Sequence, residues 1–488
     1  MSYPLWRLRA GSALLPDQTA AADVFGPLDR LTLERLLKAA LQNGGEFAEI
    51  YAEHSVRNSF ILDEERISAA RCGVDTGLGI RVLNAARTGY AYSENLDVEE
   101  LEKTAHAASL IGRGAGGRNV SALRKKSFSS HYLVRTSPES IASKEKAALL
   151  RNANSMARSY DRRIKQVKIV YEEHIKKILI ANTEGVLAND NSTQTNLGLF
   201  VSASDNGKTS SGYAFKSGAL GYEHYDMKTV ARLVNEAGRM AVSMLEAKDA
   251  PAGEYPVVMA KEHCGLFFHE AIGHSLEGDY ALTRTSCFWD KKGSRIASEI
   301  VSLADQGVLP GSRGTINMDD EGTAGQRTIL IDKGECRGFL FDRLNAELMK
   351  AASTGNGRRE SFRFFPIPRM TNTYLMPGED DPQDIVKSVS HGIYISRIIG
   401  GNVSPTTGNF VFIAPEAYLI ESGKITSPLR SIQLIGRGTE VLKKITMIGP
   451  DLGSMDGGDC GKDDQSVPVS CGNPTFKVAD ITVGGARI

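Results

Sequence analysis

The stretch Phe267-Phe268-His269-Glu270-Ala271-Ile272-Gly273-His274 places two imidazoles around a carboxylate inside an otherwise apolar run. In the motif His-Glu-x-x-His, two His four residues apart share one side of a helix and bind a metal, and the Glu reaches the metal-bound water. Here the spacing is five, so the two side chains would diverge by roughly 140° on a regular helix. The backbone must therefore deviate, and Gly273 allows this best, by ending the helix or through a one-turn π-bulge.

A purely structural interpretation of the same stretch is also open. Phe268, Ile272 and Leu276 have the spacing of a buried amphipathic helix, in which the two His would be hydrogen-bonded core residues. The stretch alone does not decide between this helix and a metal site.

A catalytic zinc needs about three protein ligands and one open position for water, so a third donor must come from elsewhere. Glu277 and Asp279 are candidates because they follow closely in the sequence. Cys460 is a more distant candidate, because glycines flank it and the nearby Lys462 favours its thiolate. His274 and Cys460 can meet only if the whole intervening domain closes around the site, which would couple metal binding to folding.

The chain resembles the TldD branch of the TldD/PmbA family, once described as modulators of DNA gyrase and now regarded as metallopeptidases with a His-Glu-x-x-x-His motif. Only about the first thirty residues lack a matching stretch. The stretches that carry the resemblance are Gly77–Val82, His269–Asp279, Asp320–Thr323, Thr354–Ser361, Arg369–Thr373, Glu416–Glu421 and Cys460–Lys462.

The resemblance implies a zinc metallopeptidase in which His269, His274 and Cys460 bind Zn²⁺ and Glu270 is the catalytic base. It also implies a PmbA-like (TldE) paralogous subunit as partner, and unfolded or peptide substrates such as leader peptides and antitoxins. The alternative is a non-catalytic modulator that acts on gyrase-related systems. That type is expected to lack the His-Glu-His-Cys set, which is present here.

The segment 354–359, Thr-Gly-Asn-Gly-Arg-Arg, is polar and glycine-rich. Such a segment suits a binding loop or an ordinary surface loop equally, and the resemblance favours a loop near the cleft. Asn356, Arg358 and Arg359 are therefore candidates for substrate binding.

The composition excludes several classes of protein. Lys plus Arg and Asp plus Glu both total 58 without a long basic block, so direct nucleic-acid binding is not expected. The six Cys show no disulfide framework, and we find neither a secretory signal nor a run of about 18 apolar residues. We therefore expect a cytoplasmic protein that does not enter a membrane.

A length of 488 residues predicts at least two domains. We expect an α+β fold with an irregular arm over 1–30, a helix–sheet domain over 31–248, and a strand-rich antiparallel domain over 254–488 that carries the motif helix. Residues 112–117 are interpreted as a flexible linker. Helices are predicted over 31–41, 97–111, 137–160 and 225–248, and strands over 47–56, 57–70, 73–92 (as a hairpin), 167–204 (with a turn at 182–185), 255–259, 328–331, 339–342, 392–399, 409–413, 417–422 and 424–427.

Overall fold

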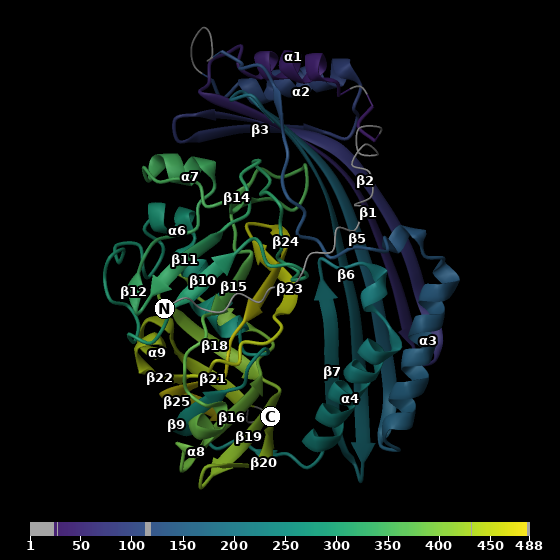
Figure 1. The fold of residues 1–488 in the computed structure, drawn as a ribbon, viewed down its shortest axis with the longest axis vertical. Helices are drawn as coiled ribbons and strands as arrows, with labels where there is room; N and C mark the ends of the chain where they lie inside the picture. Colours follow the sequence, from purple (N-terminus) through teal and green to yellow (C-terminus); the bar gives the residue numbers. More distant parts are fainter. Residues whose placement is uncertain (1–23, 27, 113–118, 431, 486–488) are drawn as a thin grey trace.

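The computed structural model combines helices and antiparallel-rich sheets, so the expected α+β class is confirmed (Figure 1). The expected arm over 1–30 and linker over 112–117 fall largely outside the described residues. The domain boundaries at 31–248 and 254–488 stay predictions. The described residues are 24–26, 28–112, 119–430 and 432–485.

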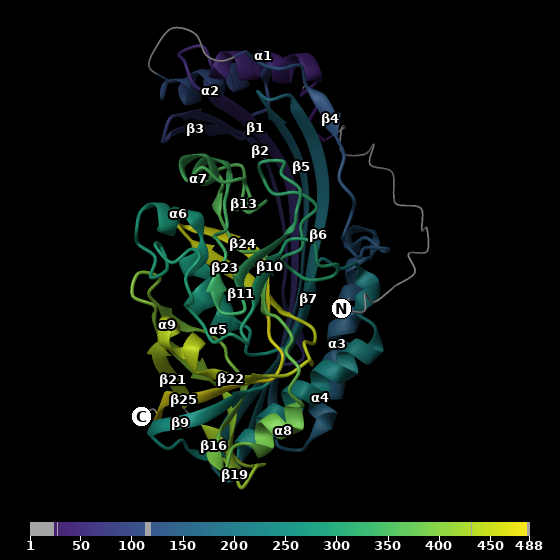
Figure 2. The same ribbon diagram turned by 60° about the vertical axis from the view of Figure 1, so that its left-hand side comes forward.

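The first half of the chain forms a seven-stranded sheet of long strands that curve around the second half (Figures 1 and 2). Its order is β3-β2-β1-β5-β6-β4, and β7 also pairs with β6. All neighbours are antiparallel except β4 and β6. The strands are β1 Phe47–Asp63, β2 Arg66–Asn84, β3 Arg87–Ser93, β4 Arg124–Lys126, β5 Ile164–Asn182, β6 Val186–Asp205 and β7 Lys208–Gly218.

The expected strand break between residues 56 and 57 is wrong. Strand β1 continues to Asp63 because it is paired along both edges, with β2 on one side and β5 on the other. The chain turns instead at Glu64 and Glu65, which adopt positive φ angles of 46° and 68°. The expected turn at 182–185 is confirmed between β5 and β6.

Four helices cover one face of this sheet. Side chains of alternate β1 residues pack against the first two helices at one end and the last two at the other. The expected helix over 137–160 starts only at Ser143, because residues 138–140 form a separate 3₁₀ turn. The helices are α1 Arg30–Ala40, α2 Val98–Ser109, α3 Ser143–Tyr160 and α4 Met227–Met244.

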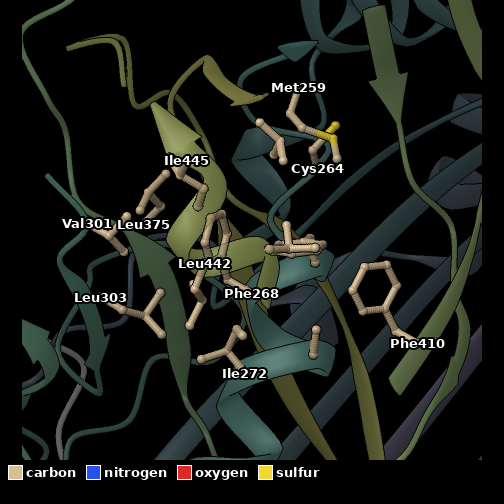
Figure 3. Packing of buried hydrophobic residues seen from close by; sticks show 14 of the residues in the cluster. Met259, Cys264, Phe268, Ile272, Val301, Leu303, Leu375, Phe410, Leu442 and Ile445 are labelled. Carbon is tan, nitrogen blue, oxygen red and sulfur yellow. The ribbon is translucent and has the colours of Figure 1, made fainter. Parts of the chain in front are cut away.

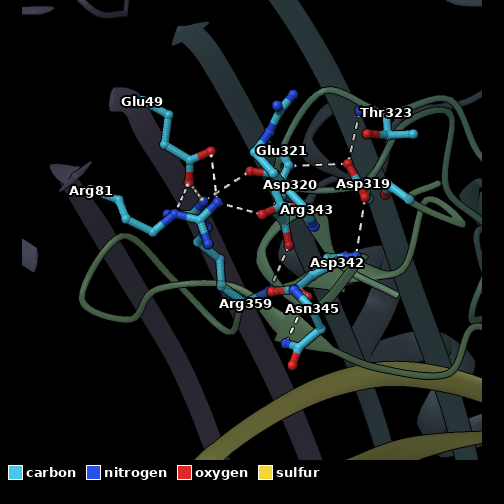
Figure 4. Close-up of polar contacts among 12 residues, drawn as sticks. Glu49, Arg81, Asp319, Asp320, Glu321, Thr323, Asp342, Arg343, Asn345 and Arg359 are labelled. Carbon is cyan, nitrogen blue, oxygen red and sulfur yellow. Dashed lines mark hydrogen bonds and ion pairs between the residues drawn. The ribbon is translucent and has the colours of Figure 1, made fainter. Parts of the chain in front are cut away.

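The opposite face of the sheet contacts the second half of the chain. Tyr51, Ile178 and Ile180 form an apolar cluster there with Met318 and Phe362. Beside this cluster lies a buried group of carboxylates and guanidinium groups (Figure 4). The two halves of the chain are thus joined by both apolar and ionic contacts.

The second half forms a ten-stranded and a six-stranded sheet. Apolar side chains between the sheets form the largest core cluster (Figure 3). The ten-stranded sheet has the order β17-β18-β21-β25-β9-β16-β19-β20-β8, and β22 also pairs with β25. Its strands are β8 Lys248–Asp249, β9 Gly253–Met259, β16 His391–Arg397, β17 Gly401–Val403, β18 Asn409–Ala414, β19 Glu416–Glu421, β20 Lys424–Arg430, β21 Ile432–Arg437, β22 Ile445–Ile448 and β25 Phe476–Gly485.

The six-stranded sheet has the order β12-β11-β10-β15-β24-β23, which makes β23 an outer strand. Two short strands, β13 and β14, pair separately. The strands are β10 Leu303–Gln306, β11 Arg327–Asp332, β12 Glu335–Cys336, β13 Gly357–Arg358, β14 Ile367–Pro368, β15 Asn372–Leu375, β23 Asp456–Lys462 and β24 Gln465–Gly472.

The predicted strand over 339–342 is wrong. Leu340 makes only an isolated bridge with Glu277. The chain cannot extend the pairing because Asp342 caps helix α7, Arg343–Leu348, by accepting a hydrogen bond from the Asn345 N–H. This helix and α8, Pro382–Lys387, are short. None of the helices in the described part of the chain has the length and apolar character needed to cross a membrane.

Candidate metal centre

The motif segment changes its helical form at the two His. A short helix α5, Leu266–Phe268, runs into a π turn, η4, over His269–Gly273, and a 3₁₀ turn, η5, follows over His274–Leu276. The His274 N–H donates to the carbonyl of His269, five residues earlier. The π turn brings the two imidazoles together, with ring centroids 5.1 Å apart. The deviation expected from the His spacing is therefore present, and it takes the π form.

Packing holds the motif segment in this shape. Phe268 and Ile272 are buried in the core beside Leu442 (Figure 3). A Cβ atom on Gly273 would overlap the sulfur of the buried Met370, so a side chain at this position would require Met370 to move. The buried apolar spacing of Phe268, Ile272 and Leu276 is therefore present, and their packing holds the polar residues of the motif in place.

His269, His274 and Cys460 form a cluster, which we call the metal cluster, whose donor atoms all lie within 4.8 Å of one another. The Cys460 Sγ lies 3.3 Å from His274 Nε2. Cys460 reaches the motif because it lies on β23, in the hairpin with β24. Within the described ranges, no other set of three His, Cys, Asp or Glu is placed to hold a metal ion.

The charges of the metal cluster favour a thiolate. Burial raises the pKa of Cys460, but His269 and His274 outweigh this and lower it to about 4. Burial lowers the pKa of His274, and the nearby Glu277 and Cys460 more than reverse this, so that it lies well above its usual value. His269 Nδ1 is buried and has no hydrogen-bond partner. A thiolate and imidazole nitrogens are the donors that zinc prefers.

Glu277 and Asp279, the other candidate ligands, do not join the metal cluster. Glu277 Oε2 accepts a hydrogen bond from His274 Nδ1 at 2.9 Å and one from Lys462 Nζ at 3.0 Å. Asp279 also accepts from Lys462, at 2.8 Å. Burial raises the pKa of Glu277, but Lys462 and His274 outweigh it and lower the pKa to about 2. Both carboxylates therefore bind the Lys462 ammonium, and Glu277 also supports His274.

Glu270 lies at the accessible side of the metal cluster. Its side chain is 30% exposed, and its Oε2 is 3.9 Å from His274 Nε2. The three cluster residues are buried or nearly so. Solvent therefore reaches the Glu270 carboxylate, which lies next to the buried cluster.

Two buried arginines brace the hairpin that carries Cys460. Arg369 donates to the carbonyl of Cys460 and, at 3.3 Å, to that of Gln465. Arg358 donates to the carbonyls of Met370 and Pro468, at 2.7 and 2.8 Å. Sequence reasoning missed this role, because a hydrogen bond to a backbone carbonyl leaves no pattern in the sequence.

The three candidate substrate-binding residues are buried in the same region. Asn356 donates to Asp305 at 2.9 Å, and Arg359 donates to Glu49 at 2.6 Å. With Arg358 bonded to the carbonyls named above, all three side chains have partners inside the protein. Their role in substrate binding stays a prediction.

A cavity of about 540 Å³ lies between the inner face of the seven-stranded sheet and the second half of the chain. Its lining includes His174 of β5 and Asp459 and Pro468 of the hairpin, but none of the metal cluster. Because the side chains of neighbouring strand residues point to opposite faces, Asp459 faces this cavity and Cys460 faces the metal cluster. The hairpin thus separates this cavity from the metal cluster.

Comparison with known proteins covers nearly the whole chain. Three family models of the PmbA/TldA metallopeptidases match: domain 1 at residues 48–111, the central domain at 136–245 and the C-terminal domain at 252–485. A metalloprotease TldD homolog of Buchnera aphidicola is 38% identical over 95% of this chain and 96% of its own length. A zinc metalloprotease TldD homolog of Saccharolobus solfataricus is 29% identical over 92% of this chain and 99% of its own.

Solved structures share the fold. A proposed modulator of a DNA gyrase from Thermotoga maritima has a TM-score of 0.77 at 21% identity, covering 93% of this chain and 99% of that one. TldE from Thermococcus kodakarensis has a TM-score of 0.75 at 18% identity, covering 93% of this chain and all of the other. At these identities the likeness concerns the fold alone.

Proposed function

Because the chain belongs to the PmbA/TldD family of metallopeptidases, we propose that it is a zinc peptidase with His269, His274 and Cys460 as ligands and Glu270 as the base. The observation that carries this proposal is the convergence of these four residues. Two neighbouring His reach a Cys that lies 186 residues further along the chain, beside an accessible carboxylate.

The donor set fits zinc. Structural data on zinc sites give Zn–N of about 2.0–2.1 Å and Zn–S of about 2.3 Å, which separates donors around a tetrahedral ion by roughly 3–4 Å. The Sγ to Nε2 distance of 3.3 Å has this size. Two nitrogens and one sulfur leave a fourth position for water or a substrate carbonyl. Because the pKa of Cys460 is lowered to about 4, its side chain is a thiolate at neutral pH, which is the form that binds a metal.

Each residue then has a defined task in peptide hydrolysis. When bound, zinc supplies a Lewis acid for the peptide carbonyl. Glu270 accepts the proton of the attacking water at its carboxylate and later passes it to the leaving amine. The buried Phe267 and Ile272 hold the motif segment fixed, so that the carboxylate keeps its place beside the cluster.

The substrate is proposed to bind in an extended form. Strand β23 carries Cys460 and is an outer strand of its sheet. Because Ser217 and Arg313 already donate to the carbonyls of Gly457 and Gly458, an added peptide strand is proposed to pair with the part of this edge nearer Cys460. Such pairing ignores side chains, so the sequence preference is broad, and folded substrates must open first. Leader peptides and antitoxin-like proteins are substrates of this kind. A PmbA/TldE-like paralogue, without a metal of its own, is proposed as the partner subunit.

The alternative, a non-catalytic modulator, is less well supported. Such a protein has no need for a thiolate, two imidazoles and an accessible carboxylate within one small site. In this chain all four groups meet.

The deciding experiment measures zinc content and peptide cleavage on the same purified protein, with and without a co-expressed paralogue. We expect about one zinc per chain. A destabilised reporter protein should be cleaved at a rate that follows its unfolded population, and the cleavage rate should rise when the paralogue is present. Equal cleavage of the native and the destabilised reporter would refute extended binding. Zinc-loaded protein that cleaves no unfolded peptide in either form would refute the peptidase.

A further inference from the structure

We propose that Glu277 and Lys462 are a positioning pair that fixes the ring of His274 and ties the motif segment to strand β23 before any metal binds. The proposal rests on the metal site proposed above, and it assigns a function to two residues that touch neither the metal nor the substrate.

The first step of the argument concerns the hydrogen on the imidazole. Glu277 is fully buried, and its Oε2 accepts from His274 Nδ1 at 2.9 Å. A carboxylate of this kind only accepts, so Nδ1 must carry a hydrogen. The other ring nitrogen, Nε2, is then the atom turned to Cys460, 3.3 Å away. Glu277 thus determines that Nε2, and not Nδ1, is the nitrogen of His274 that can bind a metal.

The second step concerns Lys462, whose ammonium is used entirely inside the protein. It donates to Glu277 at 3.0 Å, to Asp279 at 2.8 Å and to the Pro368 carbonyl at 3.1 Å. It also lies 4.5 Å from the ring centroid of Tyr280. Its side chain is 2% exposed, so solvent and substrate do not reach it.

The third step is the connection that these contacts make. Lys462 lies two residues after Cys460, on the same face of β23. Glu277 lies three residues after His274. One carboxylate oxygen accepts from both His274 and Lys462, so a single atom joins the segments that carry two of the ligands, and these segments are 185 residues apart in the sequence. None of these bonds requires a metal.

Two substitutions at Glu277 separate charge from hydrogen bonding. Glu277→Gln keeps one oxygen that can accept both bonds but removes the charge, and Glu277→Leu keeps only the volume. Because Asp279 binds Lys462 without touching His274, Asp279→Asn is the matched control.

Two readouts are needed. The first is the zinc dissociation constant from competition with a chelator. The second is the ring N–H proton of His274 in the metal-free protein, observed by NMR and assigned with His274→Ala. A hydrogen-bonded, slowly exchanging proton marks a fixed ring.

We expect Glu277→Leu to weaken zinc binding by about 10–100-fold and to abolish the slowly exchanging proton. Glu277→Gln should retain that proton and weaken zinc binding less than Glu277→Leu does. Asp279→Asn should retain the proton and change the zinc dissociation constant by less than about threefold. Unchanged affinity and an unchanged proton in Glu277→Leu would overturn the proposal, as would an equal loss in Asp279→Asn.

The Gln variant keeps the proposal testable if the Leu variant does not fold. Loss of the proton in folded Glu277→Gln would then contradict it, because the acceptor oxygen is still present. If the starting protein binds no zinc, the metal site itself is refuted, while the NMR signal still decides whether Glu277 fixes His274.

Discussion

Two buried polar clusters join distant parts of this chain, and they differ in the solvent exposure of their carboxylates. The metal cluster brings motif residues to β23, and the ion network brings Glu49 and Arg81 of the seven-stranded sheet to Glu321 and Arg359 of the second half (Figure 4). In the ion network every carboxylate faces a guanidinium group or backbone N–H groups. In the metal cluster the Glu270 side chain is 30% exposed, whereas Glu49 and Glu321 of the ion network are 1% and 0% exposed.

Two further carboxylates beside the ion network, Asp319 and Asp342, have raised pKa values. Burial and the charge of Glu321 raise the pKa of Asp342 to about 7 and that of Asp319 well above its usual range. Perturbed carboxylates of this kind are often taken as marks of an active site. Here burial and the neighbouring Glu321 carboxylate cause the shifts, and Asp319 also lines the cavity described above. Donor chemistry, rather than a perturbed carboxyl pKa, therefore identifies the metal site.

The largest effect is expected from removing the thiolate. Cys460→Ala should lose tight, stoichiometric zinc and all measurable peptide cleavage, because two imidazoles alone hold zinc weakly. Elemental analysis of the purified variant measures this. Tight zinc at one per chain in the variant would show that a carboxylate such as Glu277 is the third ligand.

The next effect separates the base from the ligands. Glu270→Gln should keep zinc and fold but reduce turnover by about 10²–10⁴-fold, since an amide does not accept the proton of the attacking water. Steady-state cleavage and zinc content on the same sample test this. Full activity would remove Glu270 from the mechanism, and loss of zinc would give it a ligand role.

A substitution in the ion network should affect stability and leave the zinc content of the folded protein unchanged. Arg81→Met leaves Glu49 and Glu321 buried without this partner, which should cost about 3–5 kcal/mol of unfolding free energy. Arg337→Met is the control, because its pairs with Asp332 and Glu335 are exposed and should cost at most about 1 kcal/mol. Urea denaturation compares the two. Equal losses would mean that burial is not the cause.

The smallest effect depends on pH. The pKa of Asp342 is raised on folding, so the stability that its protonated form contributes is complete below about pH 4 and is lost as the pH rises towards 7. Asp342→Asn can still cap α7, but its side chain does not ionise, so it loses no stability as the pH rises. Its unfolding free energy, relative to the unchanged protein, should rise by about 1–3 kcal/mol between pH 5 and pH 8. A difference that does not vary with pH would contradict this.

The sequence predicted features that depend on local pattern. The turn at 182–185 and the long strands around it follow from alternation and turn residues. The five-residue spacing of His269 and His274 required a backbone deviation, which the π turn provides. The strand predicted over 339–342 is wrong, because the four residues Phe-Leu-Phe-Asp are too few to show a strand or helix period.

Contacts between distant residues could not be predicted from pattern. Arg359 and Glu49 are 310 residues apart, and neither has a neighbour that indicates the other. Glu277 was a candidate ligand by proximity, and only the position of Lys462 shows that it supports His274. The same limit applies to Arg369, whose partner is the carbonyl of Cys460.

The distance in sequence between the ligands has a consequence for synthesis of the protein. His274 leaves the ribosome 186 residues before Cys460. At about 5–20 residues per second, the nascent chain exists for roughly 10–40 s with both imidazoles and no thiolate. The three donors of the proposed metal site are therefore complete only after the strand-rich half has been made.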